Sequence, residues 1–373
     1  MASLFNCLST SLYERIFRAR ARRRPPERKP LHLRADSRVL VFTCAGIGDT
    51  LTDSVVFKAL RETFPRAHLG AVVHRRRKLL LEHNPWVDRI FLFHKGPLAF
   101  WRLQRELRRA GPWDAILHLR GNDPEPRCLS YLVDPDVTVS VPNMTHLDVL
   151  CGHHVAQPDW DETHGVEQTL RLARYVGADT AEPHLVYAVT GEERAQLERK
   201  LRNLGITPER PRLVLQLGGG RRASWRDWPV ARYAELIRLI RTELDADIFV
   251  LGGKDQEPRR RELALLFSGE SSPYHDVVGQ FSLAESAALL AGARVLVSTD
   301  TGIMHLGFAV GTRVIALIHC NNPASRVGPY GYGDRHRVVQ LPRPAHYRSP
   351  ADADMADLAA ETVYAQVREV WPT

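Results

Sequence analysis

Short apolar runs alternate with amphipathic segments along this chain, and the whole alternation occurs twice. The run RVLVFTC (38–44) precedes a helical pattern over 51–64, and the run PRLVLQL (211–217) precedes one over 230–244. Apolar runs of this length, separated by helices, are typical of parallel strands that are buried on both faces of a sheet. The sequence therefore predicts an α/β protein with two doubly wound parallel sheets.

The length of 373 residues also favours two domains. We expect a basic amphipathic or disordered tail over 1–37, an N-terminal domain over 38–185, a C-terminal domain over 186–350 and a final helix within 351–373. The expected strands are 38–44, 67–73, 89–93, 114–119 and 137–141 in the first domain, and 211–217, 247–253, 294–300 and 313–319 in the second. The expected helices are 51–64, 75–83, 98–110 and 165–177, then 191–204, 230–244, 258–268, 283–293, 301–311 and 351–370.

The positive charge of the chain is concentrated at its start. Residues 1–38 hold ten Lys and Arg against three acids, and so carry +7 of the net charge of +8. A nucleic-acid-binding protein usually carries such charge on its folded surface, which argues against that class. Apolar residues near helical spacing (Leu4, Phe5, Leu8, Leu12 and Ile16) precede the arginines. One interpretation is a segment that rests on anionic lipid, and the other is a solvated, disordered tail.

Membrane-spanning and metal-binding classes find little support in the sequence. No apolar stretch approaches the ~18 residues that cross a bilayer. The five cysteines are scattered without CxxC spacing, which indicates reduced thiols in a cytosol. The Asp-x-Asp pairs and the sixteen histidines lack a convincing ligand spacing, so we expect no metal site.

Glycine and charge follow the first strand. The stretch AGIGDT (45–50) stands where a strand turns into a helix, but the third glycine of a dinucleotide-binding turn is replaced by Leu51. A carboxylate at Asp49 would repel a pyrophosphate, and it suits a general base that takes a proton from a hydroxyl. The alternative is that Asp49 only caps the helix.

Two further strand ends have features of a diphosphate site. GGGRRASWRDWP (218–229) combines exposed amides, arginines and a helix start, although a simple flexible turn remains an alternative. STDTGIMHL (298–306) ends a strand in Asp300 and opens a helix with free backbone amides. Asp300 as a helix cap and His305 as a core histidine are the competing interpretations.

Taken in order, these motifs resemble glycosyltransferase family 9, the ADP-heptose:lipopolysaccharide heptosyltransferases. The resemblance rests on GIGDTLTDSVVFKALRETFPRAHLGAVV, SWRDWPVARYAEL, GGKDQE and VGQFSLAESAALLAGARVLVSTDTGIMHLGFAVGTRVIAL, and it covers most of 38–340. It implies a GT-B architecture, in which two Rossmann-like domains face each other across a cleft. The first domain would bind the acceptor and the second the nucleotide sugar, and the final helix would cross back to the first domain.

The resemblance also implies roles for individual residues. Asp49 corresponds to the catalytic base. Arg226 stands in place of a phosphate-binding lysine, and Asp300 corresponds to the residue that holds the sugar hydroxyls. The remaining donor contacts would come from Gly219, Gly220, Arg222, Asp255, Phe281, Thr301, Gly302 and His305, with Phe281 on the adenine and Asp255 or Glu257 on the ribose. On the acceptor side we expect Gly48, Arg75, Arg76 and Arg120. The two neighbouring arginines belong to HRRRK (74–78), which follows a first-domain strand and could receive an anionic acceptor; a solvated helix face is the alternative.

The implied activity is inverting and metal-independent transfer of a sugar from a nucleotide sugar, with ADP-heptose as leading donor, to a lipopolysaccharide core or another cell-surface glycan. No cofactor is expected beyond this co-substrate. The sequence departs from the family pattern at Arg221, Arg222, Lys254 and HLRGNDPEPR (118–127). A sugar-nucleotide epimerase or hydrolase, and a non-catalytic nucleotide-sugar-binding protein, remain alternatives. We expect a cytoplasmic protein, peripheral on the inner face of the membrane if residues 1–37 bind lipid, without nucleic acid as a partner.

Overall fold

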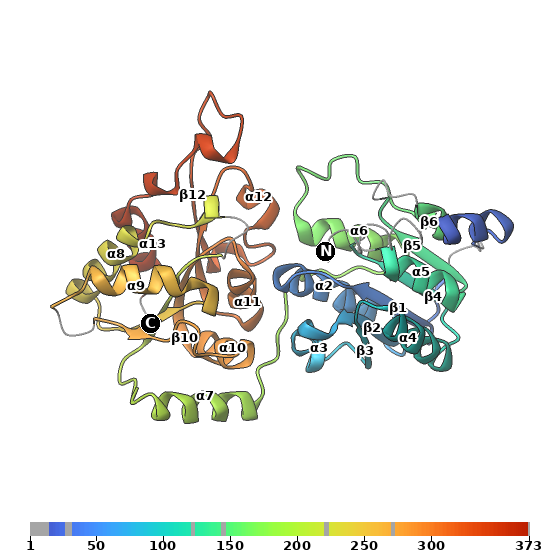
Figure 1. Cartoon of the computed structure of the whole chain (residues 1–373), viewed down its shortest axis with the longest axis horizontal. Coiled ribbons are helices and arrows are strands. Elements are labelled where there is room, and N and C mark those ends of the chain that lie inside the picture. The colour runs from blue at the N-terminus through green and yellow to red at the C-terminus, as the bar shows by residue number, and fades with distance from the viewer. Residues whose placement is uncertain are drawn as a thin grey trace. The chain divides into compact units, whose positions relative to one another are not determined.

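The computed structural model describes residues 15–26, 32–120, 124–142, 147–219, 224–269 and 273–371. The chain divides into two compact units, Met1–Pro183 and His184–Thr373 (Figure 1). Within the described residues, each unit contains a six-stranded sheet in which all neighbouring strands are parallel. The predicted class, α/β with two doubly wound sheets, is confirmed.

The first sheet has the strand order β3-β2-β1-β4-β5-β6. Its strands are β1 (Arg38–Thr43), β2 (His68–His74), β3 (Arg89–Phe93), β4 (Ala115–His118), β5 (Val137–Ser140) and β6 (His153–His154). After a helix at residues 15–23, the assigned helices of this unit are α2 (Ile47–Thr63), α3 (Leu79–Glu82), α4 (Pro97–Ala110), α5 (Pro124–Val133) and α6 (Gly165–Tyr175), with 3₁₀ turns η1 (Arg75–Arg77) and η2 (Asp148–Leu150).

Alternate residues of β1 explain how this sheet is covered on both faces. Leu40 and Phe42 belong to the apolar core that includes residues of α4 and α5. Because successive side chains of a strand point to opposite faces, Val39 and Val41 point to the other face, and they are also fully buried. Helix α2 packs there, and α6 packs against α2. Residues Thr50–Leu60 of α2 are consequently all buried, polar ones included, instead of only the expected apolar stripe.

The second sheet has the order β12-β11-β10-β7-β8-β9, which is the same arrangement written from the other edge. Its strands are β7 (Arg212–Gln216), β8 (Asp247–Leu251), β9 (His275–Asp276), β10 (Ala293–Thr299), β11 (Arg313–Ile318) and β12 (Arg337–Gln340). The helices are α7 (Gly191–Asn203), α8 (Val230–Glu243), α9 (Glu257–Leu265), α10 (Leu283–Ala291), α11 (Gly302–Val310), α12 (Ala324–Val327) and α13 (Ala360–Val370). Five 3₁₀ turns complete the elements assigned here: η3 (Ser224–Arg226), η4 (Lys254–Gln256), η5 (Gly333–Arg335), η6 (Pro350–Asp352) and η7 (Met355–Asp357).

Each sheet has a point where the strand order reverses, because the chain leaves its first strand in one direction and later returns to the other side of it. In the first sheet this point lies between β1 and β4, and in the second between β7 and β10. Open α/β sheets bind their ligands beyond the carboxyl ends of the strands at this position. The turns after β1, β4, β7 and β10 are therefore where function is expected.

The last helix begins later than expected, and its apolar residues pack within the second unit. It begins at Ala360, whereas residues 350–357 form the short turns η6 and η7. Its apolar residues Val363, Val367 and Val370 are buried in the core of the second unit, and the helix packs against α8. These contacts place the helix in the second unit and do not show the expected return to the N-terminal domain.

Part of the predicted tail is folded. Residues 15–23 form a helix, called the basic helix below, whose Phe17 and Ala21 are 7% and 5% exposed and belong to the core of the first unit. The disordered alternative is therefore wrong for this segment, since one apolar turn of it is buried. The residues Leu4, Phe5, Leu8 and Leu12 lie outside the described residues. Within the described chain, no helix is both long and apolar enough to cross a bilayer.

Candidate functional site

Asp49 lies in the first turn of α2, directly after β1. The helix begins at Ile47 with Gly46 as its N-cap, so Gly48 is part of the helix and not of the preceding loop. The Asp49 side chain is 49% exposed, and its Oδ2 accepts a long hydrogen bond of 3.4 Å from the backbone N–H of Gly46. Asp49 is thus the third residue of the helix and not, as the capping alternative expected, its N-cap; its side chain supports the helix start and still presents a carboxylate at the switch point of the first sheet.

Arg120 follows β4 and connects two carboxylates of α2. Its Nη1 lies 3.0 Å from Asp49 Oδ1, and its Nε donates to Asp53 Oδ1 at 3.0 Å. Asp53 is fully buried and also accepts a 2.6 Å hydrogen bond from the Thr43 hydroxyl. Burial raises the pKa of Asp53, against the lowering influence of Arg120 and Thr43. Sequence reasoning missed Asp53, although its position four residues after Asp49 on one helix face was a usable signal.

Arg75 and Arg76 lie in η1, directly after β2, and both are exposed. Because β2 pairs with β1 in a parallel sheet, the carboxyl ends of the two strands are neighbours. The backbone N–H of Arg76 donates to His74 Nδ1 at 3.3 Å, which holds the turn in place. Neither guanidinium makes an ion pair within the described part of the chain. The turn therefore presents positive charge at the same sheet edge as Asp49.

Arg226 and Asp300 meet at the switch point of the second sheet. Arg226 ends η3 in the segment after β7, and its Nη1 donates to Asp300 Oδ2 at 2.7 Å. Asp300 follows β10 and is only 5% exposed; Asn322 donates to the same oxygen at 2.7 Å, and His305 Nε2 lies 3.8 Å from Oδ1. Burial alone would raise the pKa of Asp300, but His305 and Arg226 together lower it to about 2. Asn322 had no sequence signal, because only the fold brings its loop here.

The start of α11 has no side-chain cap. The N-cap is Thr301, which makes no capping hydrogen bond with its side chain, so Asp300 does not cap the helix as the alternative interpretation expected. The backbone N–H groups of the first helical turn, beginning at Gly302, have no partner within the helix itself, and they carry the positive end of the helix dipole. His305 lies one turn further along. This is the geometry in which helix starts bind anions.

The glycine-rich turn after β7 approaches this helix start. Gly218 has a φ of +132°, and a Cβ there would lie 2.9 Å from Asp227 Oδ1. A Cβ on Gly219 would lie 3.1 Å from the Cγ2 atom of Thr301. Asp227 fixes the turn, because its Oδ1 accepts a 2.6 Å hydrogen bond from the backbone N–H of Gly219. The two predicted donor segments are therefore packed together. Gly220, Arg221 and Arg222 lie outside the described residues.

Asp255 and Phe281 lie at the carboxyl edge of β8. Asp255 is an exposed residue of η4, and Phe281 is half-buried just before α10. Gly279 connects their segments, since its backbone N–H donates to the carbonyl oxygen of Gly252 at 2.8 Å. Glu257, the alternative acid, is held by hydrogen bonds from Arg260 and Arg261, which lower its pKa to about 2. Asp255 makes no ion pair within the described part of the chain, so it is the carboxylate available to a ligand.

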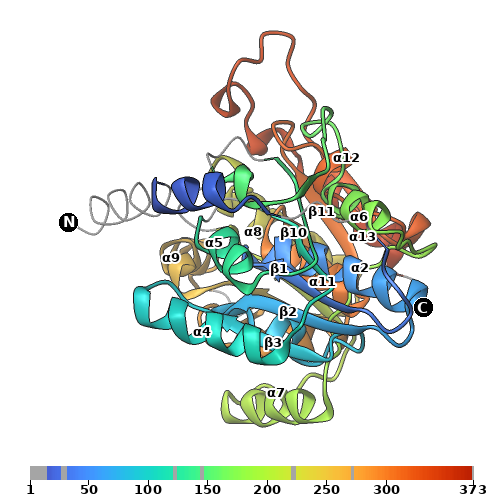
Figure 2. The ribbon, with the colours of Figure 1, turned by 90° about the vertical axis from the view of Figure 1, so that its right-hand side faces the viewer.

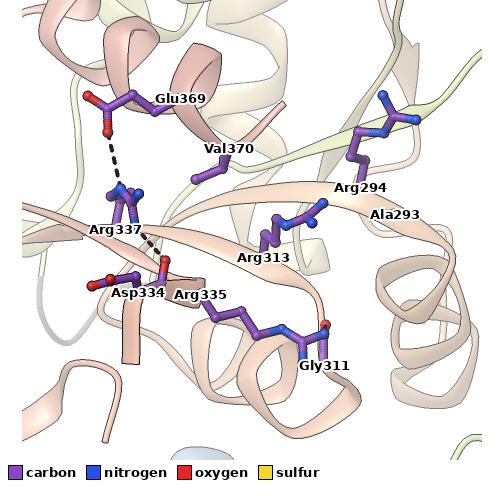
Figure 3. A pocket seen from close by; sticks show the side chains of 9 residues that line it. All are labelled: Ala293, Arg294, Gly311, Arg313, Asp334, Arg335, Arg337, Glu369 and Val370. Carbon is purple, nitrogen blue, oxygen red and sulfur yellow. Dashed lines mark hydrogen bonds and ion pairs between the residues drawn. The ribbon is translucent and has the colours of Figure 1, made fainter. Parts of the chain in front are cut away.

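A separate pocket lies at the opposite edge of the second sheet (Figure 3). Its volume is about 690 Å³, and it is lined by the amino ends of β10, β11 and β12. Its arginines mostly bind the protein itself: Arg337 pairs with Glu369 at 3.1 Å, Arg335 donates to the carbonyl of Gly311, and Arg294 donates to the carbonyl of Trp371. These contacts tie strand ends to neighbouring turns, so we assign the pocket a structural role.

Comparisons with known proteins agree with this arrangement. Residues 101–351, more than half of the chain, match the family model "Glycosyltransferase family 9 (heptosyltransferase)". Lipopolysaccharide heptosyltransferase 1 of Salmonella typhimurium is 31% identical over 219 residues, which are 58% of this chain and 58% of that relative. The matched region of this chain thus spans little more than half the length of that relative.

Two solved structures share the fold over most of their length. A family 9 glycosyl transferase from Veillonella parvula superposes with a TM-score of 0.76 at 19% identity, and the match covers 91% of this chain and 98% of that one. The Escherichia coli heptosyltransferase WaaC, solved with ADP-2-deoxy-2-fluoro heptose, gives 0.65 at 21% identity over 89% and 99%. The two parallel sheets and these neighbours confirm the GT-B type of fold. With the family model matched across both units, the chain belongs to glycosyltransferase family 9 (heptosyltransferase).

Proposed function

We propose that the protein is an inverting glycosyltransferase that moves a sugar from a nucleotide sugar to a cell-surface glycan. The leading donor is ADP-heptose, because a family relative is a lipopolysaccharide heptosyltransferase and a structural neighbour was solved with an ADP-heptose analogue. The acceptor would be a lipopolysaccharide core or a similar glycan. The observation that carries the proposal is the Arg226–Asp300 pair, 2.7 Å apart beside an uncapped helix start at a sheet switch point.

The donor would bind along the carboxyl edge of the second sheet. Its diphosphate fits the first turn of α11, at Thr301, Gly302 and His305, with Arg226 beside it. The Nε of Arg226 is buried without a hydrogen-bond partner among the described residues, which leaves a donor for a phosphate oxygen. Asp300 is placed to accept hydroxyls of the sugar. The remaining contacts to the donor would come from Asp255 to the ribose, Phe281 to the base, and Gly219, Gly220 and Arg222 to the phosphates.

The acceptor chemistry would take place at the first sheet. As the acceptor oxygen attacks the anomeric carbon, the bond from that carbon to the diphosphate oxygen breaks and ADP leaves. Asp49 takes the proton of the attacking hydroxyl, because it is the exposed carboxylate at the switch point. Attack on the face opposite the leaving group inverts the anomeric configuration. Arg120 would orient Asp49 through the 3.0 Å ion pair, while Arg75 and Arg76 attract an anionic acceptor.

The leaving diphosphate gains negative charge, and the proposal assigns its stabilisation to protein groups. Arg226 supplies a full positive charge, and the amides at the start of α11 supply the positive end of a helix dipole. Groups that are already positioned stabilise such charge without reorganising during the reaction. With these groups in place, transfer should not require a metal ion. Transfer rates measured after chelation with EDTA, and again after divalent ions are added back, test this expectation.

The test compares Asp49→Asn and Arg226→Met with the parent protein. Asp49→Asn should lower the transfer rate about 10²- to 10⁴-fold, the usual contribution of general base catalysis. It should leave ADP binding unchanged, measured as the ligand-induced rise in Tm. Arg226→Met should weaken ADP binding as well as the rate.

Near-normal transfer by Asp49→Asn would refute its role as the base. Rapid release of free sugar from the donor in water alone, unaffected by acceptor, would favour a hydrolase or epimerase. Full function without both Asp49 and Arg226 would favour a non-catalytic binding protein. The cytoplasmic location at the inner face of the membrane stays a prediction.

A further inference from the structure

Helix α4 has an outward face that combines arginines with exposed apolar side chains. Its buried residues, among them Phe100, Leu103 and Leu107, pack into the core of the first unit. Leu98 is 87% exposed and Trp101 is 50% exposed, which is uncommon for such large apolar side chains. The same outward face carries four exposed arginines: Arg102, Arg105, Arg108 and Arg109. Leu98, Trp101 and these arginines are called the α4 face below.

The charge of the α4 face is not neutralised by the protein. The helix contains one acid, Glu106, and this residue pairs with Arg89 of β3 at 3.4 Å. None of the four arginines makes an ion pair with a residue in the described ranges. Surface arginines that only solubilise a protein are usually interspersed with acids. A run of arginines without counter-charges instead fits a surface that meets an anionic partner.

The basic helix lies beside α4 and adds to this charge. Phe17 and Ala21 anchor it in the core, and the ring of Phe17 meets that of Tyr131 edge-on at 6.3 Å. The Tyr131 hydroxyl donates to Arg24 O at 2.7 Å, and Arg24 pairs with Asp134 at 2.6 Å. With its inner side fixed in this way, the helix exposes Arg15, Ile16, Arg20, Arg22 and Arg23. In Figures 1 and 2 it and α4 lie on the same side of the first unit.

Two hollows flank Trp101. One, of about 350 Å³, lies between the basic helix and α4, and its lining includes Arg20, Arg24, Arg105 and Arg108. The other, of about 710 Å³, lies on the other side of α4, and its lining includes Arg102 and Arg109. Guanidinium groups bind phosphate oxygens through paired hydrogen bonds. Each hollow also has one acid in its lining, Asp134 in the first and Glu106 in the second, but arginines outnumber it in both. Each hollow therefore has the size and charge to receive a phosphate head group, with the indole ring of Trp101 between the two.

We propose that the α4 face and the basic helix together bind the surface of a bilayer that contains anionic phospholipids. The arginines would contact lipid phosphates, and Trp101 and Leu98 would enter the head-group layer, where tryptophan side chains are enriched. The positive charge would also suit a nucleic acid, but nucleic-acid binding gives no reason for a leucine as exposed as Leu98 on this surface. Lipid binding at this surface is a property separate from sugar transfer, and it is measured without the sugar donor or acceptor.

The experiment is co-sedimentation of the full chain with vesicles of phosphatidylcholine, alone or mixed with phosphatidylglycerol. The parent protein should sediment with the mixed vesicles and stay in solution with the neutral ones, and added salt should release it. The variant Arg105→Gln/Arg108→Gln should bind the mixed vesicles roughly 30-fold more weakly, about fivefold for each arginine removed near the surface. Trp101→Ser should weaken binding at high salt, where the apolar contribution remains.

The matched control is Arg194→Gln/Arg202→Gln. Both residues are exposed on α7 of the second unit, neither makes an ion pair within the described part of the chain, and the net charge changes by the same amount. This variant should bind mixed vesicles like the parent protein. Circular dichroism spectra and Tm values of both variants should match the parent, so that a loss of fold is recognised.

Three outcomes would overturn the proposal. The first is unchanged vesicle binding by Arg105→Gln/Arg108→Gln, and the second is an equal loss in the α7 control, which would indicate a response to net charge alone. The third is a preference for duplex DNA over mixed vesicles at equal phosphate concentration. Transfer to a water-soluble acceptor fragment should be the same in the α4 variant and the parent, so a failure of the lipid proposal is distinguishable from a failure of the proposed function.

Discussion

The guanidinium of Arg120 lies 3.0 Å from the carboxylate of Asp49, and this pair joins the turn after β4 to the turn after β1. The second unit contains a pair in the equivalent position: Arg226 after β7 and Asp300 after β10, 2.7 Å apart. Because both sheets share one strand order, both pairs span the point where that order reverses. In the first pair the carboxylate is exposed, and in the second it is 5% exposed. This difference is what a proton acceptor and a fixed binding group require.

Removing Arg120 should destabilise the first unit. Arg120→Met leaves Asp53 buried without its cation, and breaking such a pair costs about 3–5 kcal/mol. Arg120→Met/Asp53→Asn should recover most of this free energy of unfolding, since no buried charge remains unpaired. The transfer rate should not recover, because Asp49 still lacks its positioning partner. Urea denaturation and kcat measured across pH check both parts; a double variant with the parent kcat and pH profile would remove Arg120 from any positioning role.

Stability at acid pH should depend on Asp300. Its pKa in the folded protein, about 2, lies below the ordinary value of 3.8, owing to His305 and Arg226 against the opposing effect of burial. A lowered pKa stabilises the fold above pH 4, and the contribution disappears as the pH falls from about 4 to about 2. The difference corresponds to about 2 kcal/mol.

Asp300→Asn lacks that contribution at every pH. The variant should therefore be less stable than the parent at pH 6, and its stability should fall less between pH 4 and pH 2. Thermal unfolding followed by circular dichroism over this range measures both quantities. Parallel curves for the two proteins would show that Asp300 is not held as an ion by Arg226 and His305.

The ribose contact should belong to Asp255 and not to Glu257. Asp255→Asn should weaken ADP binding about 10-fold or more, since hydrogen bonds to a charged group contribute about 1.5–3 kcal/mol. The matched variant Glu257→Gln should bind ADP like the parent, because Arg260 and Arg261 already occupy that carboxylate. Titration calorimetry with ADP and 2′-deoxy-ADP measures the effect. Loss of affinity in Glu257→Gln alone would reverse the assignment.

The turn at Gly218 should tolerate no side chain. Gly218→Ala combines a φ of +132° with a Cβ 2.9 Å from Asp227 Oδ1, so a loss of about 1–3 kcal/mol in stability is expected together with weaker ADP binding. The control is Gly191→Ala at the start of α7, where a Cβ would meet no atom within 4 Å. Tm with and without ADP checks both. Equal behaviour of the two variants would show that the turn adapts to a Cβ.

Most strands were predicted from the sequence alone, because a strand that is buried on both faces consists of an uninterrupted run of apolar residues. The run at 38–44 became β1, and the run at 211–217 became β7. Two helix starts were predicted wrongly. The start of α2 was placed four residues late, because Gly48 reads as a loop residue although it lies inside the helix. The last helix was predicted to begin nine residues before its observed start, because the amphipathic pattern of the sequence continues into the turns η6 and η7.

The candidate site was predictable where it depends on strand ends and was missed where it depends on distant loops. Asp49, Arg226 and Asp300 follow strands directly, so an α/β topology places them at the edges where ligands bind. Asn322 donates a hydrogen bond to Asp300 from a loop 22 residues later in the chain, and no local sequence pattern predicts such a contact. Asp53 was overlooked because its partners, Thr43 of β1 and Arg120 after β4, are 10 and 67 residues away along the chain.

The burial of Phe17 and Ala21 has a practical consequence for anyone preparing this protein. A basic N-terminal tail is an obvious candidate for removal before expression or crystallisation. A chain that begins at residue 32 would lack these two core side chains, and the apolar side chains of α4 and α5 that pack against them would be exposed to solvent. Such a shortened protein would be prone to precipitate, so cleavage sites and fusion tags belong ahead of residue 15.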